Sequence, residues 1–353
     1  MDNKIEPTHQ EEVYGSPRRK GGIMNKLYPP GPQPGAKGRM KNHCRKFWWC
    51  DCLVLVVVVL VIVLSLIFVG IPNIAQSQIN DSSLEVTSQE VTNPQSDSVH
   101  LKIDTVIRSD SSFHPKIDGF RAALSLAGQQ PFIHIDIPEV KSEKETRITV
   151  EQDVKFDSVD SFTAYTKAVL ASESLDLHLD GKTTIHLSGL PAMDVDYNKV
   201  ITMKGLNKLS NLNISDVKIL SGKNEILSDG SNLIGNVSIP NPSVMTLSLG
   251  DTTLDLSVDG KAVGYSLIPN LVLKPGQNTL PMQSHVDQLT ILGLVQSKYR
   301  DAIIPLDIVG NSSISNGQHL TYYEEAIKSN TIRLNLDIGP ALAGIGINIT
   351  SMA

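Results

Sequence analysis

The run LVLVVVVLVIVLSLIFVGI begins at Leu53 and ends at Ile71, and its nineteen residues contain no charge and one hydroxyl, that of Ser65. As an α-helix this run is about 28 Å long, close to the ~30 Å hydrocarbon core of a bilayer. It predicts a membrane span. A cleaved signal peptide is the weaker interpretation, because the region before the run is long and the run exceeds the usual apolar core of about 7–15 residues.

Charge differs between the two sides of the run. Residues 1–52 hold ten Lys or Arg and five Asp or Glu, a net +5, which leaves −11 for the rest of a chain whose total is −6. Basic flanks are typical of the cytosolic side, so we expect a cytosolic N-terminus and a lumenal or extracellular C-terminal part. An acidic ectodomain argues against nucleic acid as a partner.

The segment before the span carries its own signals. Residues 1–46 are rich in Pro, Gly and basic residues and predict a disordered cytosolic tail, followed by a juxtamembrane anchor and transmembrane helix over 47–72. Trp48 and Trp49 are typical of membrane-interface anchors. Cys44, Cys50 and Cys52 lie beside basic residues and suit S-palmitoylation, with free cytosolic thiols as the alternative.

The chain after the span is predicted to be mainly β. Apolar and polar residues alternate in many short runs, such as SVHLKID at 98–104 and FIHIDI at 132–137, and turn signals such as Asp259-Gly260 and Asn316-Gly317 separate them. No cysteine lies in this part, so a packed core must stabilise it without disulfides. The pattern predicts antiparallel β-sandwich structure.

Two stretches have helical spacing, 158–170 and 286–299, and each is followed by a strand that ends in glycine. This internal repeat predicts two tandem immunoglobulin-like sandwiches over 80–208 and 212–353, each with one helix. One large sandwich is the alternative.

Five N-glycosylation sequons begin at Asn80, Asn213, Asn236, Asn311 and Asn348. All follow the span, which agrees with the orientation that the charges predict. Each sequon alone is weak, because such triplets also occur by chance.

No cofactor, metal site or enzymatic activity is predicted. A hairpin around Asp180-Gly181-Lys182 would place Asp176, His178 and His186 on one exposed face, where they could ligate zinc. Paired polar residues on an exposed sheet face are ordinary, however, and no fourth ligand is visible. The sequence also lacks G-x-S-x-G, H-E-x-x-H and a phosphate-binding loop.

An apolar ligand is a stronger candidate. Several strands carry bulky apolar residues beyond strict alternation, such as Leu271-Val272-Leu273, and residues 341–347 are nearly free of polar side chains. An open-ended sandwich of this kind could hold an acyl chain. A well-filled core explains the same residues and is the simpler interpretation.

The second half contains NLIGNVSIPNPS at 232–243, LSLG at 247–250 and LVLKPGQN at 271–278. These motifs resemble the group 2 late-embryogenesis-abundant domain, also called the water stress and hypersensitive response domain. With the run CRKFWWC at 44–50 before one span, the chain resembles a fungal membrane family of unknown function with such lumenal domains. The first half departs from the pattern, since Gln95 follows Asn93-Pro94 where serine is expected.

That resemblance implies an immunoglobulin-like sandwich and a single-pass protein with a lumenal C-terminus in a vacuolar or other endomembrane. It also implies organelle regulation and lipid handling, and it supplies no catalytic residues. We therefore expect a type II glycoprotein whose lumenal domains bind a partner, with lipid and protein as the candidates. The alternative is a plasma-membrane protein with a structural or stress-protective ectodomain and no small-molecule ligand.

Overall fold

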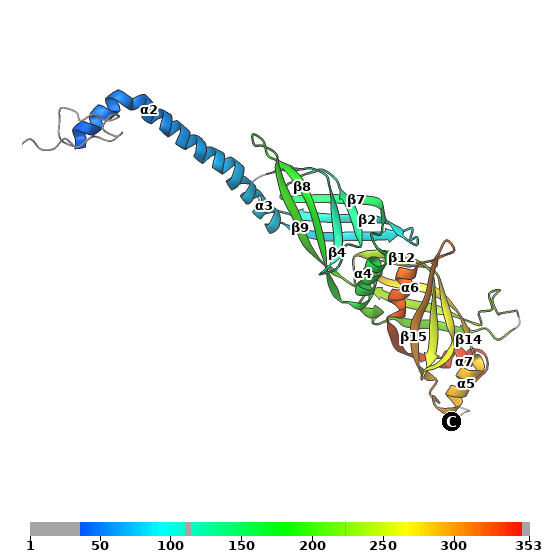
Figure 1. Ribbon diagram of the computed structural model, residues 1–353. Helices are drawn as coiled ribbons and strands as arrows, with labels where there is room; N and C mark the ends of the chain where they lie inside the picture. The colour runs from blue at the N-terminus through cyan, green and yellow to red at the C-terminus, as the bar shows by residue number, and fades with distance from the viewer. Residues whose placement is uncertain (1–35, 110–113, 223, 348–353) are drawn as a thin grey trace, which may run out of the picture. The chain divides into compact units, whose positions relative to one another are not determined.

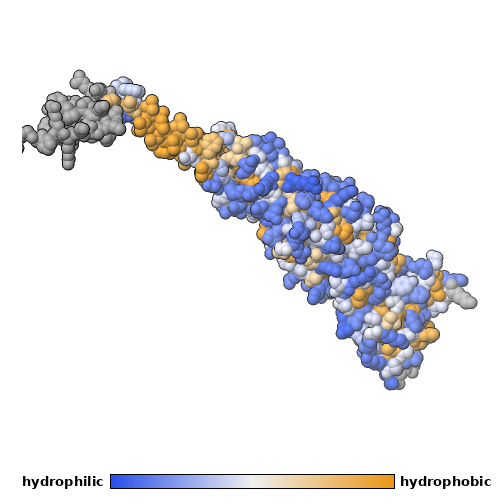
Figure 2. All heavy atoms as spheres, in the orientation of Figure 1, coloured by the Kyte–Doolittle hydropathy of each residue, from blue (hydrophilic) through white to orange (hydrophobic). Residues whose placement is uncertain are grey.

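The computed structural model describes residues 36–109, 114–222 and 224–347, which fall into two units, Met1–Gly70 and Ile71–Ala353. The first unit is helical. It consists of α2 (Ala36–Ser65) and the π-helical turn η1 (Leu66–Gly70). Side chains at positions 53–64 are all at least 43% exposed, and Figure 2 shows their surface as a continuous apolar band.

By length and composition, the helix over Phe47–Asp81 can cross a membrane. A continuous apolar surface of this size needs lipid or a protein partner around it. This confirms one candidate membrane-spanning helix near the N-terminus.

The helix begins earlier than the sequence predicts. The disordered tail was expected to extend to residue 46, but α2 starts at Ala36, so that prediction is wrong over 36–46; residues 1–35 lie outside the described part. Adding a turn to an existing helix is much easier than starting one, and Pro34 lies just before the extension. The helix kinks at Phe47 (φ −125°, ψ 15°), where the anchor was predicted to begin.

The second unit is mainly β, as the alternation predicts, and opens with helix α3 (Ile71–Asp81) (Figure 1). A six-stranded sheet is built from β3 (Lys116–Ile117), β4 (Phe120–Leu126), β5 (Ile133–Ile137), β6 (Val140–Lys141), β8 (Ser174–His186) and β9 (Met193–Lys204). It packs against part of the other sheet, an antiparallel trio made of β1 (Ser83–Thr92), β2 (Ser98–Arg108) and β7 (Glu145–Lys155).

That other sheet has eleven strands in the described residues. Besides the trio it holds β10 (Asn213–Ile219), β11 (Leu233–Asn241), β12 (Met245–Val258), β13 (Lys261–Leu273), β14 (Gly276–Val286), β15 (Ile303–Ser315), β16 (Gln318–His319) and β17 (Thr331–Asp337). The first and second halves meet in it, because β1 pairs in parallel with β12, with Gln89 opposite Met245. The division near 208–212 stays a prediction.

Both predicted helices are present, as α4 (Val159–Ala171), which Ser158 caps, and α5 (Gln288–Ser297), which Asp287 caps. The prediction of one helix in each half is wrong for 212–353, which also contains α6 (Thr321–Lys328) and α7 (Gly339–Gly344). These helices are short, so tertiary burial of Tyr322 and Leu342 stabilises them more than their intrinsic helical propensity does.

Helices α4 and α6 join the halves, and Figure 1 shows them side by side. The Thr166 hydroxyl donates to the backbone carbonyl of Tyr322 at 2.8 Å. The Tyr322 side chain is fully buried, its ring lies 5.1 Å from that of Phe162, and its hydroxyl donates to the backbone carbonyl of Gln95. A residue of the second half therefore completes the aromatic core of the first.

The Asn-Pro-Ser motif shapes the turn between β11 and β12. The buried Asn241 side chain accepts hydrogen bonds from the amide and hydroxyl of Ser243 and donates to the carbonyl of Met245. Asn278 similarly holds the turn between β13 and β14 through the backbone of Lys274. These motif residues serve the fold.

Candidate functional site

An apolar cavity of about 130 Å³ lies beneath α3. Ile71, Ala75 and Ile79 line it from the helix, at a spacing that places them on one face. Its other walls come from β2, β3, β6, β7, β8, β9 and the segments next to them. We call this the α3 cavity.

A second apolar cavity, of about 70 Å³, lies between the two sheets of the first half and is named here the inter-sheet cavity. Its walls are inward-facing residues of both sheets, such as Leu101 on β2 and Leu179 on β8. The two cavities are neighbours, because they share four lining residues: Ile107, Ile117, Val140 and Tyr197.

Tyr197 is the polar exception in this shared wall. Its side chain is only 4% exposed, and its hydroxyl has no hydrogen-bond partner among the described residues. Burial raises the pKa of the Tyr197 hydroxyl to about 12, so it stays protonated and can donate. The ring packs against Phe120 at 5.3 Å between centroids, which fixes where the hydroxyl lies.

The alternation of β9 explains why Tyr197 faces inward. Every second residue from Met193 to Met203 is buried, and Lys199 shares that face. The Lys199 ammonium donates to the backbone carbonyls of Ile79, Asn80 and Ser82, at and just beyond the C-terminal end of α3. Burial lowers the pKa of Lys199, and the Asp81 carboxylate partly opposes this.

Gln76 attaches α3 to β9 at a second point. Its side-chain amide donates to the carbonyl of Asp196 at 2.7 Å and accepts from the amide of the same residue at 2.9 Å. The edge of β9 away from β8 is thereby covered, and α3 is fixed over the cavity as one wall.

The second half contains an apolar cavity of about 170 Å³ between its sheet and helices α5 and α7, lined in part by Met282, Leu292 and Leu342. Its polar wall atoms are satisfied: the Ser284 hydroxyl donates to that of Ser266 at 3.0 Å, and the Gln288 amide donates to backbone carbonyls. It lacks an unpartnered group comparable to the Tyr197 hydroxyl among the described residues.

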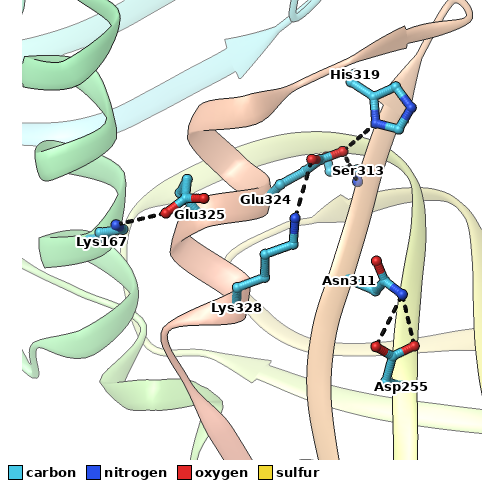
Figure 3. A network of polar contacts seen from close by, with 8 residues as sticks. All are labelled: Lys167, Asp255, Asn311, Ser313, His319, Glu324, Glu325 and Lys328. Carbon is cyan, nitrogen blue, oxygen red and sulfur yellow. Dashed lines mark hydrogen bonds and ion pairs between the residues drawn. The ribbon is translucent and has the colours of Figure 1, made fainter.

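Buried charge in this half is structural (Figure 3). The Glu324 carboxylate accepts from the His319 ring at 2.6 Å and from the Ser313 amide at 3.2 Å, and it pairs with Lys328 at 3.5 Å. Burial raises the pKa of Glu324, but the bonds from His319 and Ser313 outweigh it, so the net pKa lies below its ordinary value. Both carboxylate oxygens are thus occupied within the fold.

The three residues considered above as zinc ligands, Asp176, His178 and His186, do not form a metal site. The hairpin prediction around Asp180-Gly181 is wrong, because β8 runs straight through it. Asp176 instead accepts from Thr202, and His186 pairs with Asp118. In 36–109, 114–222 and 224–347, no group of three His, Cys, Asp or Glu residues is placed to hold a metal ion.

The sequons differ in accessibility. Asn80, Asn213 and Asn311 are exposed, whereas Asn236 is half-buried and donates to Asp216. The Asn311 amide lies against both oxygens of Asp255 (Figure 3). Asn348 lies outside the described residues.

In the anchor, Trp48 and Trp49 are 64% and 58% exposed, as an interfacial role requires. Cys50 is a half-buried and Cys52 an exposed free thiol. The side chain of Cys44 lies outside the described part. Glycosylation, interfacial anchoring and palmitoylation stay predictions.

Sequence reasoning missed Tyr197, Lys199 and Gln76. The strict alternation of 193–203 was a signal for the first two, since it places both on the apolar face. Gln76 gave no signal, because its partner lies 120 residues away.

Comparisons with known proteins add little to this geometry. No curated protein matches the chain. Among solved structures, the periplasmic chaperone SfaE matches at 9% identity over 72% of this chain and 98% of its own, with a TM-score of 0.19. A cross-linked adhesin from Mobiluncus mulieris matches at 8% identity over 70% and 83%, with a TM-score of 0.20.

The CupB6 tip adhesin from Pseudomonas aeruginosa matches at 7% identity over 72% of this chain and 98% of its own, with a TM-score of 0.18. Scores this low assign neither fold nor function. Residues 130–256, from just before β5 into β12 and including Tyr197, match the sequence profile of a family described as "Protein of unknown function (DUF3712)".

Proposed function

We propose that this chain is a type II, single-pass membrane glycoprotein whose C-terminal unit binds the acyl chain of a lipid. The observation that carries the proposal is the pair of neighbouring apolar cavities, which together extend from α3 to the space between the sheets. In the chain, α3 begins at Ile71, directly after the last residue of the helical unit that contains the apolar run.

The size of the cavities suits part of an acyl chain. A cavity of about 150 Å³ lined by Leu, Ile and Phe is large enough to bind benzene. The α3 cavity alone is close to that volume, at about 130 Å³. Each methylene moved from water contributes about 0.8 kcal/mol, so six contribute roughly 5 kcal/mol. An acyl chain that moves from a bilayer into the cavity gains far less free energy, because both environments are apolar. Its exchange between the cavity and the membrane is then nearly balanced in free energy.

The remaining parts of the proposal follow from the sequence. They are two immunoglobulin-like sandwiches, a cytosolic N-terminus, glycans on the lumenal side, a vacuolar or other endomembrane and a binding role without catalysis. The charge difference and the one-sided sequons support the orientation. Glycosidase treatment of the full chain tests it, because mobility must shift if the C-terminal unit is lumenal. Imaging of a tagged full chain distinguishes an internal membrane from the cell surface.

Photocrosslinking tests the binding role. The full chain is placed in nanodiscs that contain a phospholipid with a diazirine near the end of one acyl chain, and adducts are mapped by peptide mass spectrometry. We expect adducts on strands β2, β8 and β9 in addition to those on the span. Adducts confined to residues 47–72 would overturn the proposal.

A matched pair of variants sharpens the result. Ala75 is 8% exposed and faces the α3 cavity, so Ala75→Phe fills part of it. Ala171 is exposed at the end of α4, so Ala171→Phe adds the same ring outside the cavities. Strand adducts should fall in the first variant and persist in the second.

A further inference from the structure

We infer that the acyl ligand is an ester-linked lipid whose neutral carbonyl oxygen accepts a hydrogen bond from the Tyr197 hydroxyl. This rests on the proposed function and adds the chemical class of the ligand and the residue that distinguishes it. The decisive feature is one unpartnered donor in a wall that is otherwise apolar.

A buried hydroxyl without a partner is costly, so folded proteins rarely leave one. Two other buried tyrosine hydroxyls of this unit are bonded: that of Tyr322 donates to the carbonyl of Gln95, and that of Tyr165 accepts from Gln89. The Tyr197 hydroxyl differs, because it lines both cavities and has no partner among the described residues. An occupant with an acceptor oxygen at this point supplies the missing bond.

The surroundings favour a neutral acceptor over an anion. The cavity walls near Tyr197 are formed by Ile107, Ile117 and Val140. A carboxylate placed there would be desolvated without a counter-ion, which is far costlier than burying an ester carbonyl that receives a hydrogen bond. Lys199 does not line either cavity, and its ammonium is held by the backbone carbonyls at the end of α3.

Polar groups lie where the rest of such a lipid would be. Gln78, Ser82, Ser142 and Thr146 line the α3 cavity together with its apolar residues. The inter-sheet cavity, on the other side of Tyr197, is lined almost entirely by apolar side chains. This polarity places the ester at Tyr197, the end of the hydrocarbon tail between the sheets, and the polar part of the lipid toward the polar residues of the α3 cavity.

The test uses two probes that differ only in the carbonyl. Ester-linked and ether-linked phosphatidylcholine carry the same diazirine at the same chain position, and each is added to the full chain in nanodiscs. Adducts on the strand peptides are quantified relative to adducts on the span. One hydrogen bond is expected to favour the ester probe about two- to tenfold.

Tyr197→Phe removes the hydroxyl and keeps the ring, and Tyr323→Phe is the matched control. The Tyr323 hydroxyl is also buried and unpartnered among the described residues, but it lines a different cavity, of about 40 Å³, between α4 and α6. We expect the ester preference to disappear in Tyr197→Phe and to persist in Tyr323→Phe. Both variants should fold, since each loses a hydroxyl without a partner, and their melting temperatures without added lipid should equal or exceed the parent value.

The outcomes separate the two proposals. Strand adducts from both probes in equal amounts would overturn the ester assignment while leaving acyl binding intact. An ester preference that persists in Tyr197→Phe would also overturn the ester assignment to Tyr197, because another group would then donate to the carbonyl. No strand adducts from either probe would overturn acyl binding itself.

Discussion

Gln76 on α3 and Asp196 on β9 form a two-way contact, in which the glutamine amide donates to the backbone carbonyl and accepts from the backbone amide of the same residue. A side chain thus takes the place of a neighbouring strand at one point on the edge of β9. It is a polar attachment that holds α3 over the α3 cavity, and Lys199 provides another.

Gln76→Ala should loosen α3 without unfolding the unit. Three side-chain hydrogen bonds are lost at a half-buried site, two with Asp196 and one to Asn80, so we expect a loss of about 1 kcal/mol in unfolding free energy. Hydrogen exchange should become faster over 71–82 and at Asp196. Gln129→Ala is the control, since Gln129 is exposed in a turn and should leave both measurements unchanged. Unaltered exchange over 71–82 in Gln76→Ala would show that the contact does not hold the helix.

Gly181→Ala should disturb the cavity wall. A Cβ at this position would lie 2.7 Å from the ring of Phe120, which packs on Tyr197 and lines the inter-sheet cavity. The ring must move, at a cost of about 1–3 kcal/mol. Thermal and urea unfolding measure the loss. For Gly293→Ala in α5 we expect the opposite effect. A Cβ at this position meets no atom within 4 Å, so the unfolding free energy should rise by up to about 1 kcal/mol.

Tyr322→Ala should destabilise both halves together. The fully buried ring contacts the aromatic core of the first half from a helix of the second. Removing it should cost about 3–5 kcal/mol, seen as one shifted unfolding transition for the whole unit. The half-exposed Tyr265 provides the comparison, and Tyr265→Ala should cost much less. Two separate transitions in Tyr322→Ala would mean that the halves unfold independently.

Glu324 should contribute to stability in a pH-dependent way. Its folded pKa lies below the ordinary value of 4.5, so its contribution is complete above that value and is lost as the pH falls through the folded pKa. Glu324→Gln should therefore be less stable at pH 7 and lose less stability on acidification below about pH 5. Urea unfolding between pH 7 and 3 measures this.

Glu325→Gln is the neighbouring control. Glu325 pairs with Lys167 at the surface, where such pairs contribute about 0–1 kcal/mol. The loss of unfolding free energy between pH 7 and 3 should be the same in Glu325→Gln as in the parent chain. If Glu324→Gln also loses as much unfolding free energy on acidification as the parent chain, the Glu324 carboxylate does not cause the pH dependence.

The strands were predictable because alternation reports burial directly. In β9 the alternation even places Lys199 on the buried face. The sequence does not reveal the backbone carbonyls that accept hydrogen bonds from the Lys199 ammonium, because they belong to a helix 120 residues away. The error in β8 has a similar origin. Asp180-Gly181 is a common turn signal, but here the glycine leaves room for the ring of Phe120 within a continuous strand.

Helix α6 was missed for a related reason. At 8 residues it is too short for a clear period, and its position depends on Tyr322 inserting into a core made by distant residues. The candidate site likewise depends on long-range packing. The sequence shows apolar strands, but only their assembly shows a space between them and, in its wall, the Tyr197 hydroxyl without a partner among the described residues.

The parallel pairing of β1 with β12 has a consequence for how the chain is made. Gln89 and Met245 are opposite each other in the sheet, and synthesis at about 5–20 residues per second separates them by roughly 8–30 s. During that interval the edge of β1 remains uncovered on the newly made chain. Completion of the first half therefore awaits translation of the second, which makes this edge a natural point of contact for a chaperone.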